Sequence, residues 1–66
     1  MNPSDWQELA RLTARLDELC NQLETAEAES AIAMIYALEE QMVETEEMRQ
    51  RVFSRLHDRL IEEAAT

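Results

Sequence analysis

The chain has 66 residues, a formal net charge of −9 and one cysteine. A single core in so short a chain contributes only roughly 3–5 kcal/mol, so a domain of this size usually needs a disulfide, a metal or a partner chain. One cysteine excludes an internal disulfide, and one histidine with no Cys-x-x-Cys or Glu-x-x-His pair encodes no metal site, which leaves self-association or another protein.

The first helix has a readable start. Ser4 is a good N-cap, Gln7 completes a capping box, and Asp5 lies in the first turn, where its charge favours the helix dipole. Leucines then follow at alternating spacings of three and four residues, which is typical of a helix that packs along one seam. This seam consists of Leu9, Leu12, Leu16, Leu19 and Leu23.

The leucine seam stops at residues 24–30, and an apolar stripe resumes on a new phase. Continuing the first phase would place Ala26 and Ser30 on the stripe, which is too weak to bury. The chain contains no glycine, and its one proline is Pro3, so no internal position carries a strong turn signal. We therefore predict an all-α domain spanning residues 1–66, a helical hairpin with helices at about 4–24 and 28–64. One continuous helix, or three helices with a second break near Thr45, are the alternatives.

A hairpin folded around residues 25–29 places residue n near residue 54−n. Arg15 then lies near Glu39 and Glu40, and Arg11 lies near Glu44. The second helix outruns the first, so we expect part of its apolar stripe to lack a partner within the chain. The expected overhang consists of Val52, Phe53, Leu56, Leu60 and Ile61.

The segment from Ser30 to Leu38 has no charge, although the chain is 32% charged. Its large apolar side chains point in most directions around a helix, and a helix that is apolar all round is buried all round. Two hairpins pairing into a homodimeric four-helix bundle would bury it; docking to a different protein is the alternative. The predicted oligomer or partner interface consists of Ile32, Met34, Ile35, Leu38, Met42, Val52, Phe53, Leu56 and Leu60.

Acidic residues dominate the middle of the chain. Residues 16–48 contain ten acids and no base, which disfavours direct binding of nucleic acid or anionic lipid and suits a basic protein partner. A partner-facing acidic surface is predicted at Glu39, Glu40, Glu44 and Glu47. These glutamates could instead form an ordinary solvated helix face.

No residue pattern indicates catalysis or a cofactor. Cys20 lies beside the leucine seam among acids, far in sequence from His57, the one histidine, so a structural thiol is favoured over a nucleophile. Arg51, Arg55 and Arg59 form a stripe that we interpret as a solvated, salt-paired face; an acidic partner or nucleic acid is the alternative. The longest apolar run is far below the ~20 residues that span a bilayer, and the N-terminal segment lacks a signal-peptide pattern.

The segment Glu29-Ser30-Ala31-Ile32-Ala33-Met34-Ile35-Tyr36 resembles part of the second helix in the small helical-hairpin co-chaperones that guard type III secretion needle subunits. The resemblance covers eight residues and implies a hairpin that holds another protein.

Together these patterns predict a small, cytoplasmic, non-enzymatic protein-binding module that acts as a helical homodimer and regulates, inhibits or chaperones another protein. Arginine supplies all six basic residues, which hints at a bacterial or phage source. The alternatives are an acidic mimic of nucleic acid that inhibits a DNA- or RNA-binding protein, a co-chaperone of the type just described, and a purely structural coiled coil.

Overall fold

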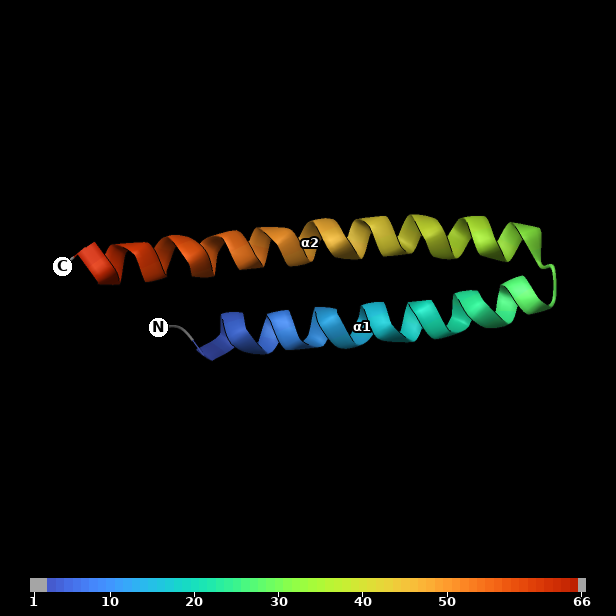
Figure 1. Ribbon diagram of the computed structural model, residues 1–66, viewed down its shortest axis with the longest axis horizontal. Helices are drawn as coiled ribbons and strands as arrows, with labels where there is room; N and C mark the ends of the chain where they lie inside the picture. The colour runs from blue at the N-terminus through green and yellow to red at the C-terminus, as the bar shows by residue number, and fades with distance from the viewer. Residues whose placement is uncertain (1–2, 66) are drawn as a thin grey trace.

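The computed structural model describes residues 3–65 and contains two long helices, α1 (Pro3–Ala28) and α2 (Ile32–Ala65). The helices run antiparallel, so the start of α1 and the end of α2 lie at the same end of the molecule (Figure 1). This arrangement confirms the predicted helical hairpin and contradicts the one-helix and three-helix alternatives. The hairpin is 54 Å long, and its radius of gyration of 15.6 Å exceeds the roughly 11 Å typical of a compact chain of this length.

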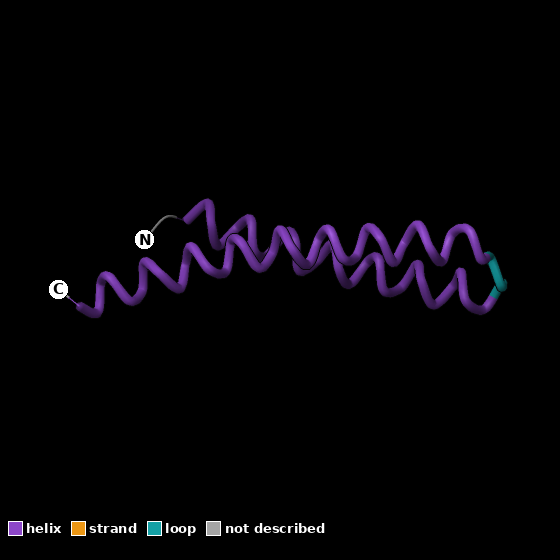
Figure 2. The backbone as a smooth tube through the Cα atoms, turned by 90° about the horizontal axis from the view of Figure 1, so that it is seen from above, coloured by secondary structure: helices purple, strands orange, loops and turns teal. Residues whose placement is uncertain are grey.

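The two helices meet along a seam with a seven-residue repeat. In α1 the buried residues Asp5, Leu12, Leu19 and Ala26 recur every seventh position. A strict repeat of this kind makes two helices coil around each other, and the helices cross at a shallow angle when viewed from above (Figure 2). In α2 the buried residues Leu38, Thr45 and Val52 keep the same repeat, and the fourth buried residue, Leu56, lies four residues after Val52.

The core consists of two apolar clusters along this seam. Near the turn, Leu19, Ala26 and Leu38 pack together, and the half-buried residues Ile35 and Met42 cover them. Near the open end, Leu12 packs with Val52 and Leu56, and Leu9 lies against them. Each fully buried leucine contributes about 1.5–3 kcal/mol through removal from water, so these few residues supply most of the hairpin's stability.

The turn is a Schellman motif built without glycine. Ser30 takes a left-handed conformation with φ 54°. The Ala31 N–H donates to the Ala26 carbonyl at 2.9 Å, and the Ser30 N–H donates to the Glu27 carbonyl at 3.1 Å, which is the paired bonding of this motif. The motif satisfies the last carbonyls of α1, so the chain can reverse within Glu29–Ala31.

Helix α1 continues four residues beyond the predicted end at residue 24. Ala26 was expected to be too small to extend the leucine seam, and that expectation is wrong, because Ala26 is fully buried. A small side chain there lets the two helices come close as they approach the turn. The turn therefore lies about four residues later than predicted.

The predicted register, with residue n near residue 54−n, is also wrong, because the turn lies later. Arg15 donates to the Gln41 side chain at 3.3 Å rather than pairing with Glu39 or Glu40. Arg11 pairs with Glu8 at 2.7 Å, within its own helix. The later register gives Val52 and Leu56 partners in α1, so the expected overhang is shorter than predicted.

Thr45 does not begin a third helix. It lies in the middle of α2, is buried in the seam, and its hydroxyl donates to the Gln41 carbonyl at 2.7 Å. The helix itself therefore satisfies the one polar group that Thr45 brings into the core. A threonine that bonds back to its own helix needs no break in that helix.

Candidate interaction surface

The chemically reactive residues do not come together. Cys20 is exposed on α1. His57 is exposed on α2, where its ring stacks on Phe53 with centroids 6.4 Å apart. A rise of 1.5 Å per residue separates Cys20 from His57 by roughly 25 Å along the hairpin. Within residues 3–65, no group of three or more potential ligands is placed to hold a metal ion.

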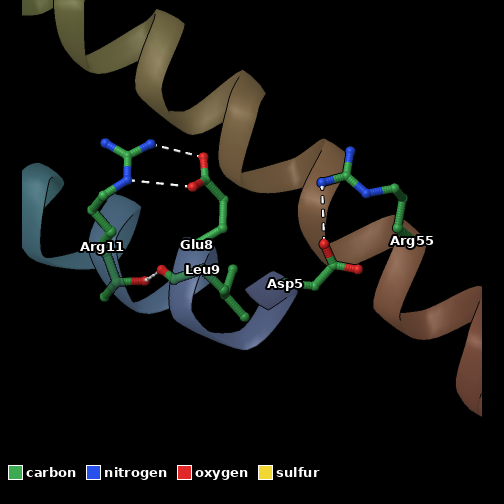
Figure 3. Close-up of polar contacts among 6 residues, drawn as sticks. Asp5, Glu8, Leu9, Arg11 and Arg55 are labelled. Atoms are coloured by element: carbon green, nitrogen blue, oxygen red, sulfur yellow. Dashed lines mark hydrogen bonds and ion pairs between the residues drawn. The ribbon is translucent and has the colours of Figure 1, made fainter. Parts of the chain in front are cut away.

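A partly buried cluster of ion pairs joins the helices at the open end. Asp5 occupies a seam position, with its Oδ2 2.5 Å from Arg59 Nη1 and its Oδ1 3.6 Å from Arg55 Nη2. Figure 3 shows the Arg55 side chain reaching from α2 to Asp5, beside the pair of Glu8 and Arg11 on α1. The predicted arginine stripe is therefore divided: Arg55 and Arg59 pair with Asp5 of α1, and Arg51 is exposed on the surface.

Another arginine crosses between the helices nearer the middle of the hairpin. Arg49 lies at a seam position of α2, and its Nε donates to the Thr13 hydroxyl of α1 at 3.0 Å. A guanidinium on a long stem can cover apolar surface with its methylenes while its head reaches polar partners. Arg49 thus continues the seam between Thr45 and Val52 without burying an unpaired charge.

On the surface of α1, the side-chain hydrogen bond from Arg11 lowers the pKa of the Glu8 carboxyl below its ordinary value. The same bond raises the pKa of the Arg11 guanidinium. Both side chains are exposed and both lie on α1. The pair therefore stabilises the charged forms of Glu8 and Arg11 but does not connect α1 to α2.

The predicted interface residues divide between the core and the surface. Leu38, Val52 and Leu56 are buried inside the hairpin, and Ile35 and Met42 pack against its core. Ile32, Met34, Phe53 and Leu60 remain exposed. The uncharged segment from Ser30 to Leu38 therefore has one face inside the hairpin, while Ile32, Met34 and Tyr36 have no cover in the chain.

The exposed apolar residues are concentrated on one side of α2. Counting around the helix from the seam, a second row lies roughly 100° away and repeats with spacings of four and three residues. We call this row the α2 flank. It consists of Ile32, Tyr36, Glu39, Val43, Glu46, Gln50, Phe53, His57, Leu60 and Ala64. All ten residues are exposed, Tyr36 most among the large apolar ones at 68%.

Trp6 of α1 lies on the same side of the hairpin as the α2 flank. The bond between Arg15 and Gln41 marks one side of the seam. Arg15 and Gln41 each directly precede a seam residue of their helix, whereas Trp6 and Phe53 each directly follow one. Trp6 and Phe53 therefore both lie on the side of the seam away from the bond between Arg15 and Gln41. Six of the nine exposed large apolar residues, Trp6 and five on the α2 flank, therefore gather on one face; Met34, Met48 and Ile61 lie elsewhere. Apolar gatherings of this kind are typical of interaction surfaces.

An open depression of about 260 Å³ lies along the α2 flank. It is lined by Gln50, Phe53, Ser54, His57 and Asp58, all from α2. Three of these, Gln50, Phe53 and His57, belong to the flank itself. A single side chain from a neighbouring helix would fit such a space better than a buried small molecule, whose sites are enclosed on several sides.

The predicted acidic residues are all exposed on α2. Glu39 lies on the α2 flank, whereas Glu40, Glu44 and Glu47 point away from α1. Among the contacts of residues 3–65, none of these four glutamates has a basic partner within 4 Å. Charge is thus distributed unevenly along the hairpin. Residues 16–48 form the half nearest the turn and contain ten acids and no base, whereas the open half contains all six arginines and the other five acids.

Three residues that hold the helices together were not predicted from the sequence. Asp5 was assigned only to the helix dipole, although its seven-residue spacing to Leu12 was a usable signal. Arg49 and Thr45 also occupy seam positions. Because the seam was predicted from the spacing of apolar residues, polar side chains at these positions were not recognised as part of it. No sequence signal marked Ser30 as the left-handed residue, because glycine normally fills that place.

Neither helix in residues 3–65 carries a stretch apolar enough, over sufficient length, to cross a bilayer. No protein-family model matches the sequence. No characterised protein and no solved structure is significantly similar to it. Similarity to known proteins therefore does not indicate the family of the chain.

Proposed function

We propose that the protein is a small non-enzymatic protein-binding module that acts as a helical homodimer and regulates, inhibits or chaperones another protein. One observation carries the proposal: six of nine exposed large apolar side chains gather on one face of the hairpin. A hairpin of two helices has no further core in which to bury them. We place this module in the cytoplasm, since its one thiol suits a reducing compartment.

The surface area supports self-association. The hairpin exposes 4908 Å², whereas a compact monomer of 7.7 kDa exposes roughly 4,300 Å². The whole hairpin measures 54 × 15 × 13 Å, so a long face such as the one that holds Trp6 and the α2 flank extends over at most 54 by 15 Å. The outline of this face is at most roughly 800 Å², which is what a stable interface buries on each partner.

Sedimentation equilibrium at micromolar concentration tests the dimer. Phe53→Asp places a charge on the α2 flank, so we expect the dimer to dissociate at least roughly tenfold more readily, as for loss of one well-buried apolar contact. Ile61→Asp is the matched control, because Ile61 is similarly exposed, 55% against 51% for Phe53, and lies off the flank. A native chain that sediments as a stable, cooperatively melting monomer would contradict the homodimer.

A second candidate function, an acidic mimic of nucleic acid, is favoured by Glu40, Glu44 and Glu47. They form an exposed row on the side of α2 away from α1, which leaves them accessible in the dimer. Such a mimic would bind a protein with a basic groove, and this binding would weaken steeply with salt. Reversing these three charges to lysine should abolish the binding; a partner that still binds the reversed variant excludes mimicry.

A further inference from the structure

The pattern of apolar and polar residues along the α2 flank is symmetric about residue 48. Pairing each member with the one equally far from residue 48 gives five pairs: Ile32 with Ala64, Tyr36 with Leu60, Glu39 with His57, Val43 with Phe53, and Glu46 with Gln50. In three pairs an apolar residue meets an apolar residue. In the other two, a carboxylate meets an imidazole or an amide, either of which can donate a hydrogen bond to it.

We infer that the partner of the α2 flank is the α2 flank of a second copy, running antiparallel, with the twofold axis beside residue 48. The inference rests on the homodimer of the proposed function and specifies its geometry. The flank contains two kinds of heptad position. In an antiparallel pair of helices, a residue of one kind faces a residue of the other kind on the second helix, as in the five pairs above. A twofold axis at residue 48 also lies at the middle of α2 (Ile32–Ala65), so the two helices overlap along their whole length.

Other alignments of the same surface are worse. A parallel dimer would set Glu39 against Glu39 and Glu46 against Glu46, and like charges directly opposed are destabilising. An antiparallel dimer shifted by one heptad in one direction would set Val43 against Glu46. The shift in the other direction would set Phe53 against Gln50. Only the alignment about residue 48 keeps apolar residues together and polar residues together.

The charge of the whole hairpin favours the same orientation. Residues 16–48 carry ten acids and no base, and the open half carries six arginines and five acids. A parallel dimer would place the two acidic halves side by side. The antiparallel dimer places each acidic half beside the open half of the partner, which removes most of that repulsion.

The depression beside Phe53 is accounted for by this dimer. Val43 is opposite Phe53 in the pairing, and Glu46 and Glu39 are opposite Gln50 and His57, which line the same depression. The Val43 side chain of the second copy would therefore enter the depression, flanked by two polar contacts. By the twofold symmetry, each copy receives one valine and contributes one.

Disulfide trapping in a Cys20→Ala background tests the geometry, because Cys20 is the only native thiol. Two variants are made, Glu39→Cys and His57→Cys, and each is oxidised alone and after mixing with subunit exchange. In the antiparallel dimer, two copies of residue 39 lie roughly 27 Å apart along the axis, far beyond the reach of a disulfide. We expect a cross-linked dimer in the mixture, joining position 39 to position 57, and at least roughly tenfold less in either variant alone, since those thiols cannot meet.

The control replaces Glu39→Cys by Glu40→Cys, which lies one residue further on and off the flank, and should not cross-link with His57→Cys. Light scattering on the same samples separates the possible failures. Dimers that cross-link within each variant alone are parallel, and dimers that never cross-link use another surface; either result overturns the antiparallel inference and leaves the homodimer intact. Monomers throughout overturn the homodimer and the inference with it.

Discussion

Ser30→Gly should stabilise the protein. A left-handed conformation costs a residue with a Cβ about 1–2 kcal/mol, and Ser30 has φ 54°. Glycine avoids this cost but loses roughly 0.5–1 kcal/mol more through its greater freedom in the unfolded chain. The difference predicts a gain of about 0.5–1 kcal/mol in the free energy of unfolding. For a domain of this size, such a gain raises the melting temperature by roughly 4 °C.

Urea and thermal denaturation, followed by circular dichroism at one fixed protein concentration, measure this gain. Ala37→Gly is the matched control: it introduces the same residue at an exposed site inside α2, where glycine should cost about 1 kcal/mol. The two substitutions must therefore shift stability in opposite directions. Loss of stability in Ser30→Gly would refute the turn, because residue 30 in a continuous helix would respond as Ala37 does.

Three further predictions concern the seam and the surface. Asp5→Ala should cost about 1–2 kcal/mol in denaturant melts, less than the roughly 3–5 for a fully buried pair, since Arg55 and Arg59 keep access to water; an unchanged midpoint would contradict the seam ion pair. Thr45→Val should leave stability unchanged or raise it by up to about 1 kcal/mol, because the hydroxyl bonds only to its own helix; a loss above that amount would reveal another partner of the hydroxyl. Glu8 has its pKa lowered by Arg11, so its stabilising contribution is present above the unfolded pKa and is lost as pH falls through the lower folded value; carboxyl NMR titration should show a low pKa that returns to normal in Arg11→Gln.

The hairpin itself could be predicted from the sequence because its evidence is local. Helix formers fill the chain, and the apolar stripe changes phase within residues 24–30, which favours two helices over the one continuous helix that the sequence also allows. The exact turn could not be predicted. Residues 24–30 contain no glycine, and the one residue that becomes left-handed, Ser30, was equally suited to be a helix cap.

The division of the apolar residues could not be predicted for a related reason. An error of a few residues at the turn changes which side chains of α2 meet α1. That error placed Val52 and Leu56 in an unpaired overhang, whereas the structure packs both against Leu12. The same error in register prevented prediction of the α2 flank. The flank can be recognised only after the α2 residues that pack against α1 have been identified.

The single reversal at Ser30 also sets an order of folding. Contacts beside the turn, such as that between Ala26 and Ala31, close a loop of a few residues, whereas Asp5 and Arg59 close a loop of more than fifty. Loop closure makes the distant contact more costly by about 2 kcal/mol. The helices should therefore associate from the turn outward, and local unfolding should begin at the open end. Amide hydrogen exchange should be slowest around Leu19 and Leu38 and fastest towards Ser4 and Ala65, so the acidic half of the molecule is also its most persistent part.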